Sequence, residues 1–432
     1  MSSKAGMPAF ARSALLLFFA LRAGDLVSVA GGLWFVPRYV SPEDIGAVLP
    51  VTSFATFLSL PVFAFAIVMM RESACLHADG ERGKVKSLLR GVFVSAAVLL
   101  VVLLAVSVAV VPRFLGAMHI SDASVGVLVV SAAFLGCVAP VYTDALQSLK
   151  RFGALAAVEF GGAVVRFLAM LVLMPVRALA GYFAGQAALP LFRMVGSVLA
   201  LRRDLAAPPR PYWDACTVRR ISLAFLAVVA YQAAPMAASL VEQYFLRTAL
   251  PVEASAGYYM VSRFSDFLHY MTFPLLLVMF PYTAEAAQRS RSTRPFVIKC
   301  SVVTLAVAAL MSAVYLFWGR ELLWLIPTGS DYAVYVRYMP WLVWITALTT
   351  CQVFCTNAEV SAGRYGFLWW LVPLHVAYPS LLWLAVNAGL VHSLDVFLLW
   401  FGAASALRFA LAAVTLLFQE MTPPQSIVPS AE

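Results

Sequence analysis

The sequence predicts an all-α membrane protein that crosses the bilayer about twelve times and consists of two six-helix lobes. Hydrophobic residues make up 62% of the chain and charged residues only 12%, whereas a soluble domain carries about 25% charged residues. Apolar stretches of about 20 residues, each long enough to cross a hydrocarbon layer roughly 30 Å thick, recur along the whole chain. Short motifs also return at one fixed offset, which indicates an internal duplication.

Twelve candidate spans account for nearly all of the chain and leave almost no room for a soluble domain. The longest connections lie at about 70–87, 202–220 and 282–296, and they are rich in basic residues. The expected spans are 14–36, 45–70, 88–111, 125–146, 154–174, 181–201, 221–245, 255–281, 297–318, 332–356, 366–388 and 395–418.

The distribution of basic residues predicts that both chain ends are cytoplasmic. With the N-terminus inside, nineteen of the thirty Lys and Arg lie on the cytoplasmic side, six on the outer side and five within spans. Basic residues gather in cytoplasmic loops, so inner loops facing an anionic leaflet explain the net charge of +9 without a nucleic-acid partner. Arg22 and Asp25 in the first apolar stretch favour a retained helix over a signal peptide.

Several function classes are disfavoured by what the sequence lacks. The six cysteines show no zinc spacing, and those in or beside loops are expected on the cytoplasmic side, so we expect neither a disulfide framework nor a metal centre. No phosphate-loop motif and no H-E-x-x-H motif occurs, and no cofactor is expected. A membrane enzyme such as a polysaccharide polymerase or ligase would need a sizeable outer loop with catalytic groups, but the expected outer loops are short. We therefore expect no enzyme.

A triplet of arginine, an aromatic residue and glycine reveals the internal repeat. It follows the fourth expected span and returns 213 residues later, after the tenth. Two prolines and two glutamates share this offset, and two arginines share it after a two-residue insertion. The pairs are Arg151-Phe152-Gly153 with Arg364-Tyr365-Gly366, Pro61 with Pro274, Glu72 with Glu285, and Arg193 with Arg408. We interpret the triplet as a tight cytoplasmic turn that glycine permits; a direct substrate role is a secondary interpretation.

The duplication predicts the domain organisation. Six crossings return the chain to the same side, so the lobes should be related by an axis along the membrane normal and face each other across a central cleft. We expect an N-terminal lobe at 1–204, a cytoplasmic linker at 205–220, a C-terminal lobe at 221–419 and a polar cytoplasmic tail at 420–432.

Eight ionisable residues lie inside the expected spans, where each arginine or aspartate at a helix centre costs roughly 2.5 to 3.5 kcal/mol. They must therefore face a water-filled cavity, a partner or both. Asp144 and Glu242 lie nearer the ends of their spans. The eight are Arg22, Asp25, Glu159, Arg166, Arg193, Arg263, Asp266 and Arg408.

Two interpretations of these charges remain open. In the first, the residues neutralise one another as the pairs Arg22–Asp25, Arg263–Asp266 and Glu159–Arg166, because each pair shares a helix face. Alternatively, the arginines present planar guanidinium groups to an anionic headgroup, a geometry that suits phosphate.

These features together resemble the Wzx-type polysaccharide flippases of the multidrug/oligosaccharidyl-lipid/polysaccharide (MOP) exporter superfamily. The resemblance rests on twelve spans in two lobes, the Arg-aromatic loop after span four, and an eighth span that ends in Phe280 and Pro281 with Glu285 shortly after. It covers nearly the whole chain. It implies a MOP/MATE-like fold in the bacterial cytoplasmic (inner) membrane, and it implies transport of an undecaprenyl-pyrophosphate-linked oligosaccharide to the outer leaflet by alternating access.

The resemblance also implies which residues bind the substrate. Arg22 in span one and Arg263 in span eight match by position, while Arg166, Arg193 and Arg408 match as cationic residues at membrane depth. Two departures matter: the chain lacks the two further helices of lipid II flippases, and Asp25 and Asp266 dilute the positive field. The alternative is a cation-coupled drug or metabolite antiporter of the same superfamily, in which Asp25, Asp266 or Glu159 is the proton or sodium site.

Overall fold

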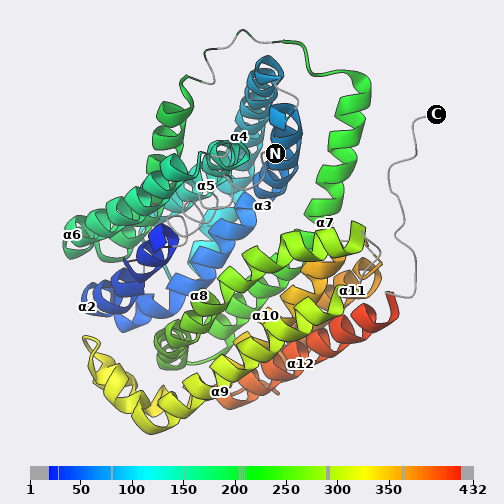
Figure 1. Ribbon diagram of the computed structural model, residues 1–432. Helices are drawn as coiled ribbons and strands as arrows, with labels where there is room; N and C mark the ends of the chain where they lie inside the picture. Colours follow the sequence, from blue (N-terminus) through cyan, green and yellow to red (C-terminus); the bar gives the residue numbers. More distant parts are fainter. Residues whose placement is uncertain are drawn as a thin grey trace. The chain divides into compact units, whose positions relative to one another are not determined.

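A computed structural model (Figure 1) describes residues 19–27, 29–78, 81–149, 151–203, 206, 208, 210–288, 292–361, 364 and 366–419. All regular elements in these ranges are helices. The start of the first expected span (14–18) and the expected tail (420–432) lie outside the described residues. Residue contacts divide the chain into two compact units, Met1–Tyr244 and Phe245–Glu432; the boundaries expected for the lobes, linker and tail stay predictions.

The first unit contains the helices of the first seven expected spans. The first span is helical over 19–27 and 29–39, and it includes a π-helical turn. The elements are η1 (Gly31–Phe35), α2 (Val36–Tyr39), α3 (Pro42–Ala78), α4 (Arg82–Ala117), α5 (Ala123–Ser148), α6 (Phe152–Leu201) and α7 (Ala215–Ala249), whose last residues belong to the second unit.

The second unit contains the remaining helices. A ten-residue 3-10 segment separates the second and third of them. The elements are α8 (Val252–Gln288), α9 (Arg294–Trp324), η3 (Gly329–Tyr338), α10 (Met339–Ser361), α11 (Leu368–Asn387) and α12 (Leu394–Gln419).

Length and apolar composition alone identify seven of the described helices as able to cross a membrane. One of them, α6, has 50 residues and would be about 75 Å long at about 1.5 Å per residue. That is more than twice the hydrocarbon thickness of about 30 Å, so α6 supplies two crossings, as expected for 154–174 and 181–201. Helices α3, α4, α7 and α8 cover the expected spans 45–70, 88–111, 221–245 and 255–281.

A single residue breaks α6 into two arms. Ala178 has φ 42° and ψ −113°, a backbone conformation that residues other than glycine rarely adopt. The second arm therefore turns back along the first. Gly181 permits this close approach, because a Cβ atom there would lie 2.5 Å from the backbone carbon of Leu173.

The packing within the first unit is repeated within the second. In the first unit α5 packs against α3, α4 and α6, and α3 also packs against α4. In the second unit α10 packs against α8, α9 and α12, and α8 also packs against α9. Under the six-helix offset α3, α4 and α5 correspond to α8, α9 and α10, so this agreement supports the duplication.

The arginine of the repeated triplet makes the same backbone hydrogen bond in both units. The backbone N–H of Arg151 donates to the carbonyl of Leu146 at 2.9 Å, and that of Arg364 donates to the carbonyl of Glu359 at the same distance. These two acceptors are themselves 213 residues apart, and the bonds close the ends of α5 and α10. The Arg151 side chain also donates to the carbonyl of Ala200 at 3.0 Å. This geometry supports the structural interpretation of the triplet.

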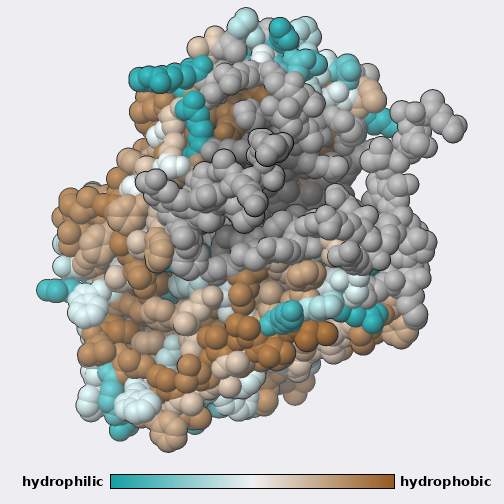
Figure 2. All heavy atoms as spheres, viewed as in Figure 1, coloured by the Kyte–Doolittle hydropathy of each residue, from teal (hydrophilic) through white to brown (hydrophobic). Residues whose placement is uncertain are grey.

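Apolar side chains line the interior of each unit and also its exterior. The core of the first unit joins α4, α5 and α6 through Leu88, Val141 and Leu155, among others. On the outside, Val108 of α4 is 79% exposed and Phe317 of α9 is 74% exposed, and hydrophobic residues cover much of the described surface in Figure 2. Such an exterior is suited to lipid rather than water.

The chain before α7 is docked on the start of α4. The backbone N–H of Arg210 donates to the carbonyl of Gly83 at 3.1 Å, and its side chain pairs with Glu81 at 3.1 Å. The indole N–H of Trp213 donates to the carbonyl of Ser87, also at 3.1 Å. Helix α7 begins at Ala215, six residues before the expected span.

Candidate functional site

Six ionisable residues of the first unit that lie at or near membrane depth are on the first helix, α5 and α6: Arg22, Asp25, Asp144, Glu159, Arg166 and Arg193. On the first helix, Arg22 Nη1 lies 2.9 Å from Asp25 Oδ2, and both side chains are partly buried. Residues three apart on a helix share a face, so the predicted Arg22–Asp25 pair is confirmed. The helix packs closely on α6, because a Cβ atom on Gly24 would lie 3.2 Å from the Cβ of Ala163.

The predicted pairing of Glu159 with Arg166 is wrong. Glu159 Oε2 instead lies 2.5 Å from Arg193 Nη2, and Arg166 Nη1 donates to Gln186 Oε1 at 3.5 Å. Seven residues along a helix correspond to about 10.5 Å, whereas the turn at Ala178 brings the second arm of α6 directly beside the first. Both contacts therefore join one arm to the other.

Two further carboxylates lie near this ion pair. Asp25 of the first helix and Asp144 of α5 both lie within electrostatic range of Glu159. With Arg22, Arg166 and Arg193, they make a cluster of three acidic and three basic side chains in one unit. We call these six residues the N-half charge cluster. Among the described residues, no three His, Cys, Asp or Glu side chains gather closely enough to hold a metal ion.

The second unit holds its span charges in two places. On α8, Arg263 Nη1 lies 3.1 Å from Asp266 Oδ2, so this predicted pair is also confirmed. The Arg263 guanidinium also lies 5.1 Å from the centre of the Tyr259 ring, and Tyr259 is fully buried. The aromatic face gives the cation a second attractive contact at membrane depth.

Arg408 of α12 is the most deeply buried of the five predicted arginines, with only 5% of its surface exposed. Its guanidinium lies 4.7 Å from the centre of the Tyr378 ring of α11. His375, one turn earlier on α11, is also buried and within electrostatic range of Arg408. The Nδ1 of His375 lies 2.8 Å from the carbonyl oxygen of Leu371 and donates to it.

Several buried ionisable or aromatic residues were missed by sequence reasoning. His375, Tyr378 and Glu359 were not singled out, although each is buried. Arg247 was assigned to an outer loop but is 5% exposed, and its Nη1 donates to Ser255 Oγ at 3.4 Å. For His375, an ionisable residue within an apolar span was a usable signal.

No protein-family model matches the chain, and no curated protein is similar to it in sequence. Solved structures do resemble it. A multidrug resistance MATE family transporter of the MOP superfamily, in an inward-facing conformation, aligns with a TM-score of 0.69 and 14% identity over 94% of this chain and 97% of that one. A MATE in a bent conformation aligns with a TM-score of 0.64 and 12% identity over 95% and 94%.

A third similar structure is a MOP superfamily transporter from Pyrococcus furiosus, described as having a binding pocket of reverse polarity. It aligns with a TM-score of 0.65 and 12% identity over 96% of each chain. Likeness at these identities establishes the fold, which is the two-lobed, all-helical, multi-pass membrane fold of MATE transporters in the MOP superfamily. The predicted fold class is thereby confirmed.

Proposed function

We propose that this protein is a transporter of the bacterial inner membrane that moves a polyprenyl-pyrophosphate-linked oligosaccharide from the cytoplasmic to the outer leaflet by alternating access. In this proposal Arg22, Arg263, Arg166, Arg193 and Arg408 bind the anionic pyrophosphate and the sugar. The lipid tail stays in the bilayer. The membrane potential, negative inside, contributes about 2.3 kcal/mol per charge per 100 mV to outward movement of an anion.

The supporting observation is the placement of the five arginines. All five lie in the bodies of helices, and each has a polar or aromatic neighbour. These pairs are Arg22 with Asp25, Arg166 with Gln186, Arg193 with Glu159, Arg263 with Tyr259 and Asp266, and Arg408 with Tyr378. A guanidinium group keeps its charge under all physiological conditions and binds phosphate through two parallel hydrogen bonds. Five such groups at membrane depth favour an anionic substrate over a cationic drug.

The N-half charge cluster favours a second candidate function. Its carboxylates Asp25 and Asp144 each lie within electrostatic range of Glu159, and a buried carboxylate can exchange a cation when its surroundings change. A proton- or sodium-coupled drug or metabolite antiporter would use these groups, and Asp266, as its ion site. The same carboxylates would equally couple a flippase to an ion gradient.

Transport in proteoliposomes separates the two functions. A fluorescent undecaprenyl-pyrophosphate glycan is placed in the inner-facing leaflet, and its appearance in the other leaflet is followed with and without a proton or sodium gradient. The flippase proposal predicts saturable movement that Arg263→Ala abolishes. Absence of such movement, together with gradient-driven uptake of an organic cation that Asp25→Asn abolishes, would replace the flippase by the antiporter.

A further inference from the structure

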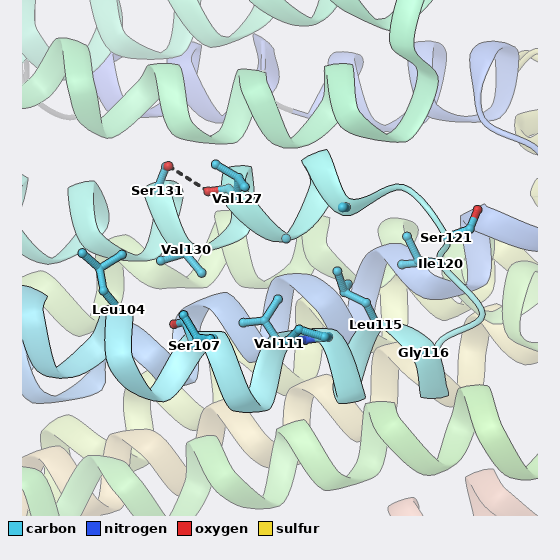
Figure 3. Close-up of a pocket in the computed structure, with 14 residues that line it drawn as sticks. Leu104, Ser107, Val111, Leu115, Gly116, Ile120, Ser121, Val127, Val130 and Ser131 are labelled. Atoms are coloured by element: carbon cyan, nitrogen blue, oxygen red, sulfur yellow. Dashed lines mark hydrogen bonds between the residues drawn. The ribbon is translucent and has the colours of Figure 1, made fainter.

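A long apolar groove runs between α4 and α5 in the first unit, away from the N-half charge cluster. Its volume is about 460 Å³, within the range of about 300 to 1,000 Å³ typical of ligand sites. Figure 3 shows Leu104, Ser107, Val111 and Leu115 along α4, with Val130 on the side of α5 nearest to them. Val127 of α5 also lines the groove.

The groove opens to the outside of the unit. Val108 and Val127, one on each wall, are 79% and 68% exposed. The hydroxyl of Ser131 donates to the carbonyl of Val127 at 2.7 Å within α5, so this polar group is already satisfied. Ser107 also lines the groove, and its buried Oγ has no hydrogen-bond partner among the described residues. Most of the other lining residues are apolar, so the groove presents a largely hydrocarbon surface to its occupant.

The length of the groove matches one leaflet. Its α4 wall extends from Leu104 to Gly116, thirteen residues that span about 18 Å of helix, and one leaflet contributes about half of a hydrocarbon layer of roughly 30 Å. The groove ends at Ser121, in the turn between α4 and α5. Arg113 and Asp122 near this end are exposed and mark the polar side of the membrane.

The corresponding helix pair of the second unit is packed by the chain itself. Helices α9 and α10 are joined through η3, which packs against α8, α9 and α10. Val336 of η3 lies so close to α9 that a Cβ atom on Gly319 would be 2.8 Å from its Cγ1. The α4–α5 turn has only five residues, 118–122, and supplies no such segment.

We propose that one acyl chain of a phospholipid fills the groove between α4 and α5, with its headgroup at the α4–α5 turn. This is the outer leaflet in the predicted orientation. A phospholipid chain fits because the groove is one leaflet long and ends at polar groups, whereas a polyprenyl tail is longer than one leaflet. The lipid would supply packing between α4 and α5 that η3 supplies between α9 and α10. The proposal does not depend on the transported substrate.

Lipid retention tests the proposal. Purified protein is loaded with palmitoyl-oleoyl phosphatidylethanolamine, and lipids retained during stepwise delipidation are counted by native mass spectrometry. Val108→Trp should fill the groove, since helical side chains lean toward the N-terminus and so toward Leu104. Val101→Trp is the matched control, because Val101 lies two turns earlier on the same exposed face and does not line the groove.

Wild type and Val101→Trp should retain one phospholipid about tenfold better than Val108→Trp, a difference of about 1.4 kcal/mol. Val127→Trp, from the opposite wall, should behave like Val108→Trp. Equal retention in all four proteins would overturn the proposal. Displacement of the phospholipid by undecaprenyl phosphate from wild type alone would also overturn it, because the groove would then hold the substrate tail.

A second measurement needs no variant. Phosphatidylethanolamine with a photoreactive diazirine in its acyl chain is incorporated with the wild-type protein into liposomes and illuminated. Labelling is expected to concentrate at residues 104–116 and 123–131. Labelling spread evenly over the exposed helices would contradict a specific lipid site.

Discussion

Glu159 and Arg193 lie 34 residues apart in the sequence, yet their side chains form an ion pair with 2.5 Å between Oε2 and Nη2. The pair joins the two arms of α6 across the turn at Ala178. Both charges lie at membrane depth, where each alone would be costly. The pair therefore stabilises the turn of α6 while it keeps a carboxylate and a guanidinium inside the first unit.

Breaking this pair should destabilise the protein. Arg193→Met leaves the Glu159 carboxylate without its cation, and we expect a loss of about 1 to 3 kcal/mol. This is less than the roughly 3 to 5 kcal/mol of a fully buried pair, because Arg193 keeps 34% of its side-chain surface exposed. Thermal unfolding in detergent measures the loss, with Arg202→Met at the exposed end of α6 as the control. The charge-swap variant, Glu159→Arg with Arg193→Glu, should recover part of the stability. If its loss of stability equalled the sum of the losses of the two single substitutions, a direct ion pair would be contradicted.

Arg263 should be required for substrate binding. Arg263→Ala removes hydrogen bonds to a charged group, which contribute about 1.5 to 3 kcal/mol, so headgroup affinity should fall about tenfold or more. Arg263→Lys keeps the charge but loses the planar fork and should restore transport only in part. Binding of the fluorescent glycan lipid reports the effect. Arg320→Ala, an exposed arginine on α9, is the control, and full activity of Arg263→Ala would rule out the headgroup role.

Asp25 can act either as a neutralising partner or as an ion site. If it only neutralises Arg22, replacing Asp25 with Asn strands a cation at membrane depth, and the double change Arg22→Ala with Asp25→Asn should be milder than Asp25→Asn alone. Insertion and transport rates of the single and double variants provide the measurement. A double variant as inactive as Arg22→Ala would instead favour contact between Arg22 and the substrate.

The contact between Arg408 and Tyr378 should depend on the aromatic face rather than on the hydroxyl group. Tyr378→Phe keeps the ring under the guanidinium, so stability should change little. Tyr378→Leu removes a desolvated cation–π contact of about 2 kcal/mol and should lower the unfolding temperature. Equal effects of the two substitutions would show that the ring face is not what holds Arg408.

Asp122 should make the start of α5 sensitive to acid. Its Oδ1 accepts a hydrogen bond from the backbone N–H of Ser124 at 2.8 Å, and hydrogen bonds from Ser124 hold the pKa of Asp122 below its ordinary value. A lowered folded-state pKa means that the stabilisation is present above the unfolded pKa and is lost as the pH falls through the folded pKa. Asp122→Ala should cost about 0.5 to 2 kcal/mol near neutral pH. The difference in stability between Asp122→Ala and wild type should shrink in acid. A difference in stability that is constant with pH would contradict a stabilising hydrogen bond from Ser124 to the Asp122 carboxylate.

The parts of the fold that are local in sequence could be predicted. The spans follow from runs of apolar residues, and the pairs Arg22–Asp25 and Arg263–Asp266 follow from helical spacing. The turn at each Arg-aromatic-Gly triplet follows from the repeat. The predicted pairing of Glu159 with Arg166 was wrong because it considered only that the two residues share a helix face. It did not consider how far apart they lie along the helix axis.

The sequence by itself determined the class of this protein, because hydrocarbon thickness, backbone hydrogen bonding and loop charge constrain each span separately. Only the tertiary structure decided the partners of Glu159, Arg193 and Arg408, and it alone revealed the groove between α4 and α5. Those contacts depend on the turn at Ala178 and on which helices pack together. These contacts join segments that are distant in the sequence, so the spacing of residues along one helix does not determine them.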